Sequence, residues 1–211
     1  MPNSFNKNIF INCPFDNDYI NDLLKPMLFI IIRNGFTPQI ALENSDSGQS
    51  RLVKITKLMK QSKYSIHDIS IIKSKKKNEY ARMNMPFELG IDYGLRNSGI
   101  SQFKNKQFLI LGNKEHDHLP AISDINGLDI MCHNNQTITL ITQLRHWFST
   151  TVKIKHQAAP IKLTEDYFEF NKILFERMLT KYGGNEMHAK NAIETFTIPE
   201  FINQIKSPKS I

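Results

Sequence analysis

Cysteine is scarce in this sequence of 211 residues, which contains only Cys13 and Cys132. Neither has a partner at the C-x-x-C spacing, so the sequence supports neither a zinc site nor a disulfide framework, and we expect two buried, reduced thiols. His116, Asp117 and His118 are adjacent in one polar segment, and no clear further ligand accompanies them. That pattern is typical of a solvated loop, because metal ligands generally converge from several elements. We therefore expect no metal site.

Long apolar runs are also missing. The longest covers residues 27–32, far short of the roughly 20 residues that a membrane-spanning helix needs. Residues 1–4 show no charged region followed by an apolar stretch, so no export signal is indicated. These absences predict a cytoplasmic protein without a membrane partner. A chain of this length can bury a substantial core, as one domain or as one domain with an appendage.

Acidic residues are outnumbered, with 20 Asp and Glu against 27 Lys and Arg, and the formal net charge is +7. This excess favours anionic partners, a nucleotide first and nucleic acid only indirectly. The only dense cluster consists of Lys73, Lys75, Lys76 and Lys77. A solvated loop and a phosphate-binding patch both fit this cluster, which follows a predicted strand closely.

Strand and helix patterns alternate along the first three quarters of the chain. Strands are predicted over residues 8–12, 36–42, 64–70, 107–111 and 128–131. Helices with one apolar face are predicted between them, from residue 19 to the Asn34-Gly35 stop, then over about 52–59, 87–95 and 137–152. Pro26 should kink the first helix or mark a boundary within it. The alternation predicts an α/β fold with a five-stranded parallel sheet and helices on both faces.

The last quarter of the chain is expected to be helical. Residues 156–160 have the character of a linker, so we divide the chain into an α/β domain at 1–155 and a helical C-terminal extension at 156–211. The first helix of this extension carries an apolar stripe from Tyr167 to Leu179 and should stop at Gly183-Gly184. Such a stripe would not be left in water. It fits packing on the sheet and, equally, a surface for a homo-oligomer or a partner protein.

Polar side chains collect where the predicted third strand ends. Asp68 and Ser70 close that strand, and Glu88 lies at the start of the next helix. Ligands of open parallel sheets bind beyond the carboxyl ends of the strands, so these three residues are expected to converge on one pocket. Helix capping by Glu88 fits its place in a first turn equally well.

Two further groups precede predicted helices. Asn12 and Asp16 follow the first strand, where they are candidates to bind ribose or phosphate, and Asp16 is also a candidate helix cap. Ser47, Gly48 and Arg51 lie before or within the second helix, where backbone N–H groups and a guanidinium suit a phosphate. A surface ion pair is the alternative for Arg51.

Several of these residues belong to motifs that together resemble a family of bacterial TIR-like proteins. The motifs occur in the family's order and lie within residues 8–150: IFINCPFD at 9–16, ALE at 41–43, DSG at 46–48, Arg51, IHDIS at 66–70 and NMPFELG at 84–90. The wider superfamily contains TIR domains and nucleoside 2-deoxyribosyltransferases, which share a flavodoxin-like fold and a glutamate after the third strand. Glu88-Leu89-Gly90 is similar to both patterns. The resemblance implies a flavodoxin-like fold and N-glycosidic chemistry.

The resemblance implies that the protein is a nucleotide N-glycosidase with a role in bacterial anti-phage defence. The bond that it would cleave is above all the nicotinamide–ribose bond of NAD. NAD would be the substrate, with no resident cofactor. Glu88 would be the catalytic carboxylate. The candidate substrate-binding residues are Asn12, Asp16, Ser47, Gly48, Arg51, Asp68, Ser70 and Asn84.

The chemistry is consistent with this role. A fixed carboxylate stabilises the oxocarbenium-like centre that forms when a ribosyl C–N bond breaks. Nicotinamide leaves as a neutral amide and needs no acid, whereas adenine or cytosine would benefit from an acid, for which Asp68, Asp16 and His67 are candidates. A deoxyribosyltransferase-like hydrolase and a nucleotide-sensing or scaffold module without turnover therefore stand as alternatives.

Overall fold

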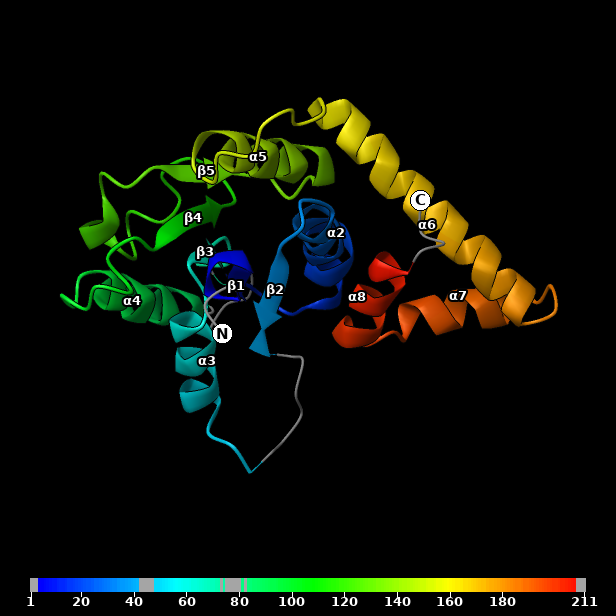
Figure 1. Cartoon of the computed structure of the whole chain (residues 1–211), viewed down its shortest axis with the longest axis horizontal. Helices are drawn as coiled ribbons and strands as arrows, with labels where there is room; N and C mark the ends of the chain where they lie inside the picture. Colours follow the sequence, from blue (N-terminus) through cyan, green and yellow to red (C-terminus); the bar gives the residue numbers. More distant parts are fainter. Residues whose placement is uncertain (1–3, 42–47, 73, 75–80, 82, 208–211) are drawn as a thin grey trace.

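The computed structural model describes residues 4–41, 48–72, 74, 81 and 83–207. Within them, five strands form one parallel sheet in the order β2-β1-β3-β4-β5 (Figure 1). This strand order is the flavodoxin-like one, and the predicted fold class is confirmed. The strands are β1 (Asn8–Asn12), β2 (Thr37–Ile40), β3 (Tyr64–Asp68), β4 (Gln107–Gly112) and β5 (Ile130–Cys132).

Helices cover both faces of the sheet. One face packs against α2 and α5, and the opposite face packs against α3 and α4. The helices of this part are α1 (Asn17–Tyr19), the π-helical segment η2 (Ile20–Leu24), α2 (Lys25–Arg33), α3 (Arg51–Lys60), α4 (Asn84–Arg96) and α5 (Thr137–Thr150). Two short 3-10 turns, η1 (Phe5–Lys7) and η4 (Ser123–Ile125), complete it.

Pro26 marks a boundary between two helical pieces, as predicted. It lies in the first turn of α2, directly after the π-helical segment η2. Proline has no N–H to donate to the carbonyl four residues earlier, which belongs to Asp22. That carbonyl accepts a hydrogen bond from Thr137 Oγ1 at 2.7 Å instead. The break in the first helical unit therefore ties it to the start of α5.

The C-terminal extension folds back onto the sheet domain. It consists of α6 (Pro160–Lys181), α7 (Glu186–Glu194) and α8 (Ile198–Lys206), and the gold helix α6 is the long diagonal of Figure 1. Gly183 and Gly184, at φ +61° and +84°, end α6 as predicted, because this backbone conformation favours glycine. Although α6 has 22 residues, no helix in the described ranges is long and apolar enough to cross a membrane.

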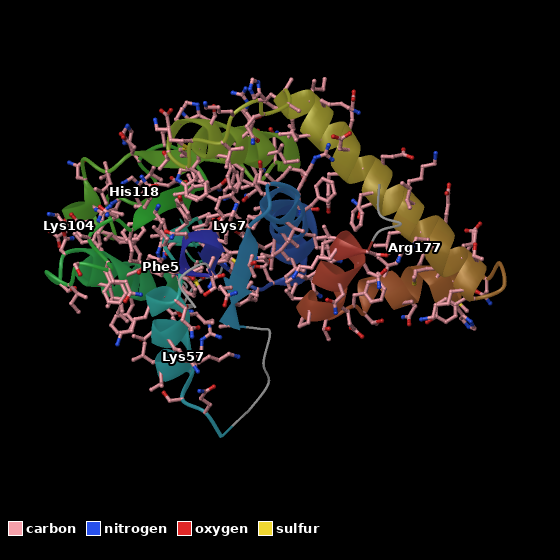
Figure 2. All side chains as sticks on the ribbon, in the orientation of Figure 1. Phe5, Lys7, Lys57, Lys104, His118 and Arg177 are labelled. Carbon is pink, nitrogen blue, oxygen red and sulfur yellow. The ribbon has the colours of Figure 1, made fainter. Side chains whose placement is uncertain are left out.

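The predicted stripe on α6 is buried against the chain's own core. Tyr167, Phe170 and Leu174 belong to the same apolar cluster as α2, and the Phe29 ring lies 5.5 Å from that of Tyr167 and 5.3 Å from that of Phe170. Helix α8 is joined to α6 by a hydrogen bond: Arg177 of α6, labelled in Figure 2, donates to Gln204 of α8 at 2.7 Å. The buried residues of the stripe thus pack on the sheet domain, the first of the two alternatives, and an assembly or partner role of the C-terminal helices stays a prediction.

Side chains of the central strands alternate between the two helix layers. Ile11 of β1 and Ile66 of β3 lie in the large cluster with α2 and α5. Phe10 packs with Ile55 of α3, on the opposite face. Because successive strand residues point to opposite faces, neighbouring residues at the end of β3 serve different layers.

Candidate functional site

Glu88 is buried in the second turn of α4, with a relative exposure of 5%. The helix begins at Asn84, one turn earlier than the sequence pattern suggested, since Pro86 is tolerated in a first turn. Glu88 therefore lies beyond the turn in which side chains cap free N–H groups, and the capping alternative loses its basis. Burial raises the pKa of Glu88, and the nearby Arg51 guanidinium partly offsets this. Ionisation of the Glu88 carboxylate therefore costs free energy in the folded protein.

Arg51 is the cation beside this carboxylate. Its Nη2 lies 3.7 Å from Glu88 Oε1, and its guanidinium lies 5.9 Å from the centre of the Phe15 ring. Arg51 is the first residue of α3, and about half of its side chain is exposed. It therefore joins the start of α3 to α4 and keeps an accessible face for an anion. Gly48 is exposed in the turn before α3, whereas Ser47 lies outside the described residues.

Asp68 is a fully buried carboxylate at the end of β3. Tyr19 Oη donates to its Oδ2 at 2.5 Å, the Ser70 N–H donates to its Oδ1 at 2.8 Å, and His133 Nε2 lies 3.1 Å from Oδ2. Burial opposes ionisation, but these contacts prevail and lower the pKa of Asp68. Asp68 is thus held as an ionised anchor for three segments, which disfavours it as a proton donor.

The structure does not bring Asp68, Ser70 and Glu88 into one pocket. Asp68 points to the layer of Tyr19, whereas its neighbour His67 points to the layer of α4. The alternation of strand side chains is the physical reason. Asp68 and Glu88 therefore lie on opposite faces of the sheet at the same carboxyl edge.

A cavity of about 530 Å³ opens on the Asp68 side of this edge. It lies between the segment after β1 and the segments after β3 and β4, and neither Glu88 nor Arg51 is among its described lining residues. The polar residues that line it include Asp16, Asp18, Asp22, Ser70, Asn113 and Lys114. Three carboxylates from one segment disfavour a phosphate here, since like charges repel.

The other predicted binding residues cap a helix, lie exposed at the start of a helix, or contact Asp68. Asp16 caps α1 by accepting from the Tyr19 N–H at 3.1 Å, which confirms the capping alternative, and it also lines the cavity. Asn84 is exposed at the first position of α4. The Ser70 N–H donates to Asp68, while its buried Oγ has no hydrogen-bond partner in the part of the chain that the structure describes. The lysine cluster at 73–77 lies outside the described residues, Ser74 excepted.

Both cysteines are unpaired, as expected, although Cys132 is only half-buried. Burial raises the pKa of Cys13, and the carboxylates of Asp68 and Glu88 raise it further. A neutral thiol is a poor nucleophile, so Cys13 is not a candidate for covalent catalysis. No group of three or more possible metal ligands occurs among the described residues.

Sequence reasoning missed a buried polar network beside Glu88. Asn12 contacts His67, His67 contacts Asp92 of α4, and Asp92 is paired with Lys106 at 3.1 Å. All four residues are at most 2% exposed. One signal was available: Asp92 follows Glu88 by four residues, so both lie on one face of the helix. The network holds the helix that carries Glu88.

Fold and site together define a flavodoxin-like α/β protein with a buried glutamate at the carboxyl edge of its sheet. Comparisons of the chain with protein-family models, with curated proteins and with solved structures gave no match.

Proposed function

We propose that the protein is a nucleotide N-glycosidase that hydrolyses the nicotinamide–ribose bond of NAD, with Glu88 as the catalytic carboxylate. The observation that carries the proposal is the position of Glu88: a buried carboxylate on α4, at the edge where parallel sheets bind ligands, beside a half-exposed arginine. The TIR-like motifs lead to the same residue. They also lead us to propose a role as an anti-phage defence effector.

The proposed reaction uses the charge of Glu88. The C1′–N bond breaks with its electron pair moving to the pyridinium ring, which leaves as neutral nicotinamide. The positive charge that develops on the ribosyl carbon is stabilised by the ionised Glu88 carboxylate, and water adds to that carbon and releases a proton. Arg51 favours the ionised form of Glu88 against the effect of burial. Its exposed face is suited to a phosphate of the substrate.

The state of Asp68 supports NAD over an adenine or cytosine leaving group. Departure of those bases benefits from a proton donor, whereas the hydrogen bonds to Asp68 outweigh the effect of its burial and lower its pKa. Asp16 is engaged as the cap of α1. Nicotinamide departure needs no such donor, so one carboxylate is sufficient.

The test is incubation of the concentrated full-length protein with NAD and a panel of nucleosides and nucleotides, with mass-spectrometric detection of released bases. Glu88→Gln should abolish nicotinamide release and leave nucleotide affinity within about twofold, because it removes charge at nearly constant volume. Glu169→Gln makes the same change at an exposed position of α6 and should behave as wild type.

Wild-type turnover in the Glu88→Gln variant would exclude Glu88 as the catalytic group. Release of a purine or pyrimidine base in place of nicotinamide would indicate a deoxyribosyltransferase-like hydrolase. Nucleotide binding by wild type without release of any base would indicate a sensor module.

A further inference from the structure

The Asn12 side chain connects the end of β1 to the helix that carries Glu88. Its Nδ2 donates to the Met85 carbonyl at 2.9 Å and to His67 Nδ1 at 3.1 Å, while its buried Oδ1 has no hydrogen-bond partner among the described residues. Met85 lies three residues before Glu88, in the first turn of α4. No side chain caps that turn at its N-cap residue, Met83. The amide of Asn12 is therefore a direct tie between the sheet and the start of the helix.

The orientation of that amide depends on the protonation state of His67. An amide nitrogen only donates, so His67 Nδ1 must be an acceptor without a proton. The ring proton is then on Nε2, which lies 3.1 Å from Asp92 Oδ2. Asp92 also accepts from Ser65 Oγ at 2.5 Å, which fixes the carboxylate. The network thus selects the neutral Nε2–H form of His67.

The opposite orientation of Asn12 would break the tie. A proton on His67 Nδ1 would face the Asn12 N–H groups, and the amide would have to rotate to present Oδ1. Oδ1 would then accept from His67, but Met85 would lose its donor. The charged groups that face His67 are Asp92 of α4 and, through it, Lys106 before β4; the Phe10 and Phe108 rings flank it from β1 and β4.

We propose that His67 is a positioning residue: as an acceptor it sets the Asn12 amide, and through Asn12 and Met85 it fixes the first turn of α4 and hence the Glu88 carboxylate. The catalytic consequence rests on the proposed function, whereas the structural consequence is independent of it. A carboxylate that must face a developing charge tolerates little displacement, so loss of this tie should lower kcat more than it changes KM.

Two substitutions of similar size separate the two ends of the His67 ring. His67→Asn places an acceptor oxygen near the Nδ1 position and keeps the contact with Asn12, but it does not reach Asp92. His67→Gln reaches Asp92 and loses the contact with Asn12. Both lose the ring contacts with Phe10 and Phe108, so they should lose similar global stability.

The first measurement is amide hydrogen exchange over residues 87–92, with the α5 segment as an internal reference. Exchange there should be about fivefold faster in His67→Gln than in His67→Asn, the size expected for one lost hydrogen bond. In active protein, kcat should fall roughly tenfold or more in His67→Gln at unchanged KM, while His67→Asn stays within about threefold of wild type. Equal exchange in the two variants would overturn the proposal.

The second measurement needs no variant to fold. His133 is also fully buried and accepts from the Asn135 N–H at its Nδ1, so the His67 ring is assigned through its contacts with the Phe10 and Phe108 rings. Nitrogen-15 NMR of wild type should show the assigned His67 ring with its proton on Nε2 and Nδ1 free of a proton. A charged His67, or a proton on Nδ1, would overturn the proposal. Because exchange and NMR need no substrate, they decide this inference even where no base release is found and the proposed function fails.

Discussion

The two faces of the sheet are built from different chemistry. The α2 and α5 face is mostly apolar and aromatic, with Phe29, Phe170 and Trp147 almost fully buried, and its buried carboxylate, Asp68, lies at the carboxyl edge of the sheet. The α3 and α4 face buries an ionic network centred on Asp92 and includes the Glu88 carboxylate. Apolar burial stabilises roughly in proportion to area, whereas a buried ion pair contributes little net stability and defines positions. The difference indicates that packing on the α2 and α5 face contributes most of the stability, whereas the ionic network on the α3 and α4 face fixes the positions of side chains.

The largest effect is expected from the aromatic face. Phe170→Ala should lower the free energy of unfolding by about 3–5 kcal/mol, because Phe170 is 1% exposed and its ring contacts Phe29 and Phe201. Phe168→Ala, two residues away and 58% exposed, is the matched control and should cost less than about 0.5 kcal/mol. Urea denaturation followed by fluorescence of the single tryptophan measures both.

A change of oligomer mass in Phe170→Ala, with stability unaffected, would show that the stripe on α6 serves assembly. Light scattering on the same samples gives that mass. The expected outcome is unchanged mass with reduced stability.

A smaller effect is expected from the ionic network. Asp92→Asn should cost about 3 kcal/mol, because it leaves the Lys106 ammonium buried without its countercharge. Lys106→Met in the same chain removes that charge, and the double variant should recover at least half of the loss. Additive losses in thermal and urea denaturation would show that the two residues act separately.

The smallest change in the free energy of unfolding is expected at Glu88, where substitution should increase stability. The folded pKa of Glu88 is raised above 4.5, so its stabilising effect is present at low pH and lost as pH rises through that folded value. At pH 7 the buried charge costs stability, and Glu88→Gln should raise the free energy of unfolding by up to about 1 kcal/mol. Denaturation at pH 7 and at pH 3 tests this: the gain should vanish in acid, and an equal gain at both values would contradict it.

The succession of strands and helices along the chain was predicted because each element has its own apolar period, whereas the flavodoxin-like fold was what the family resemblance implied. Strand β1 was predicted at its observed bounds, and β5 was displaced because its residues are only half-buried. The stripe on α6 was predicted as well. Its partner was not, because an amphipathic helix has the same pattern whether it packs on its own core or on another chain.

The candidate site was predicted in part. Glu88 was located from its neighbours, but Asp68 was assigned to the same pocket because the predicted strand did not show which helix layer each residue faces. The network was missed because its members are far apart in the sequence: Asn12 and His67 are separated by 55 positions. Contacts of that kind follow from the strand register, which pairs Asn12 with His67, and no local pattern carries them.

The packing of α2 against the C-terminal helices has a consequence during synthesis. The residues of α6 and α8 that cover the apolar side of α2 are synthesised long after it, since α2 ends at Arg33 and α6 begins only at Pro160. At 5–20 residues per second the interval is roughly 6–30 s. Throughout that time the side of α2 that faces α6 and α8 lacks these partners. We expect deletion of α8 to lower the yield of folded protein, because it leaves part of the apolar side of α2 exposed.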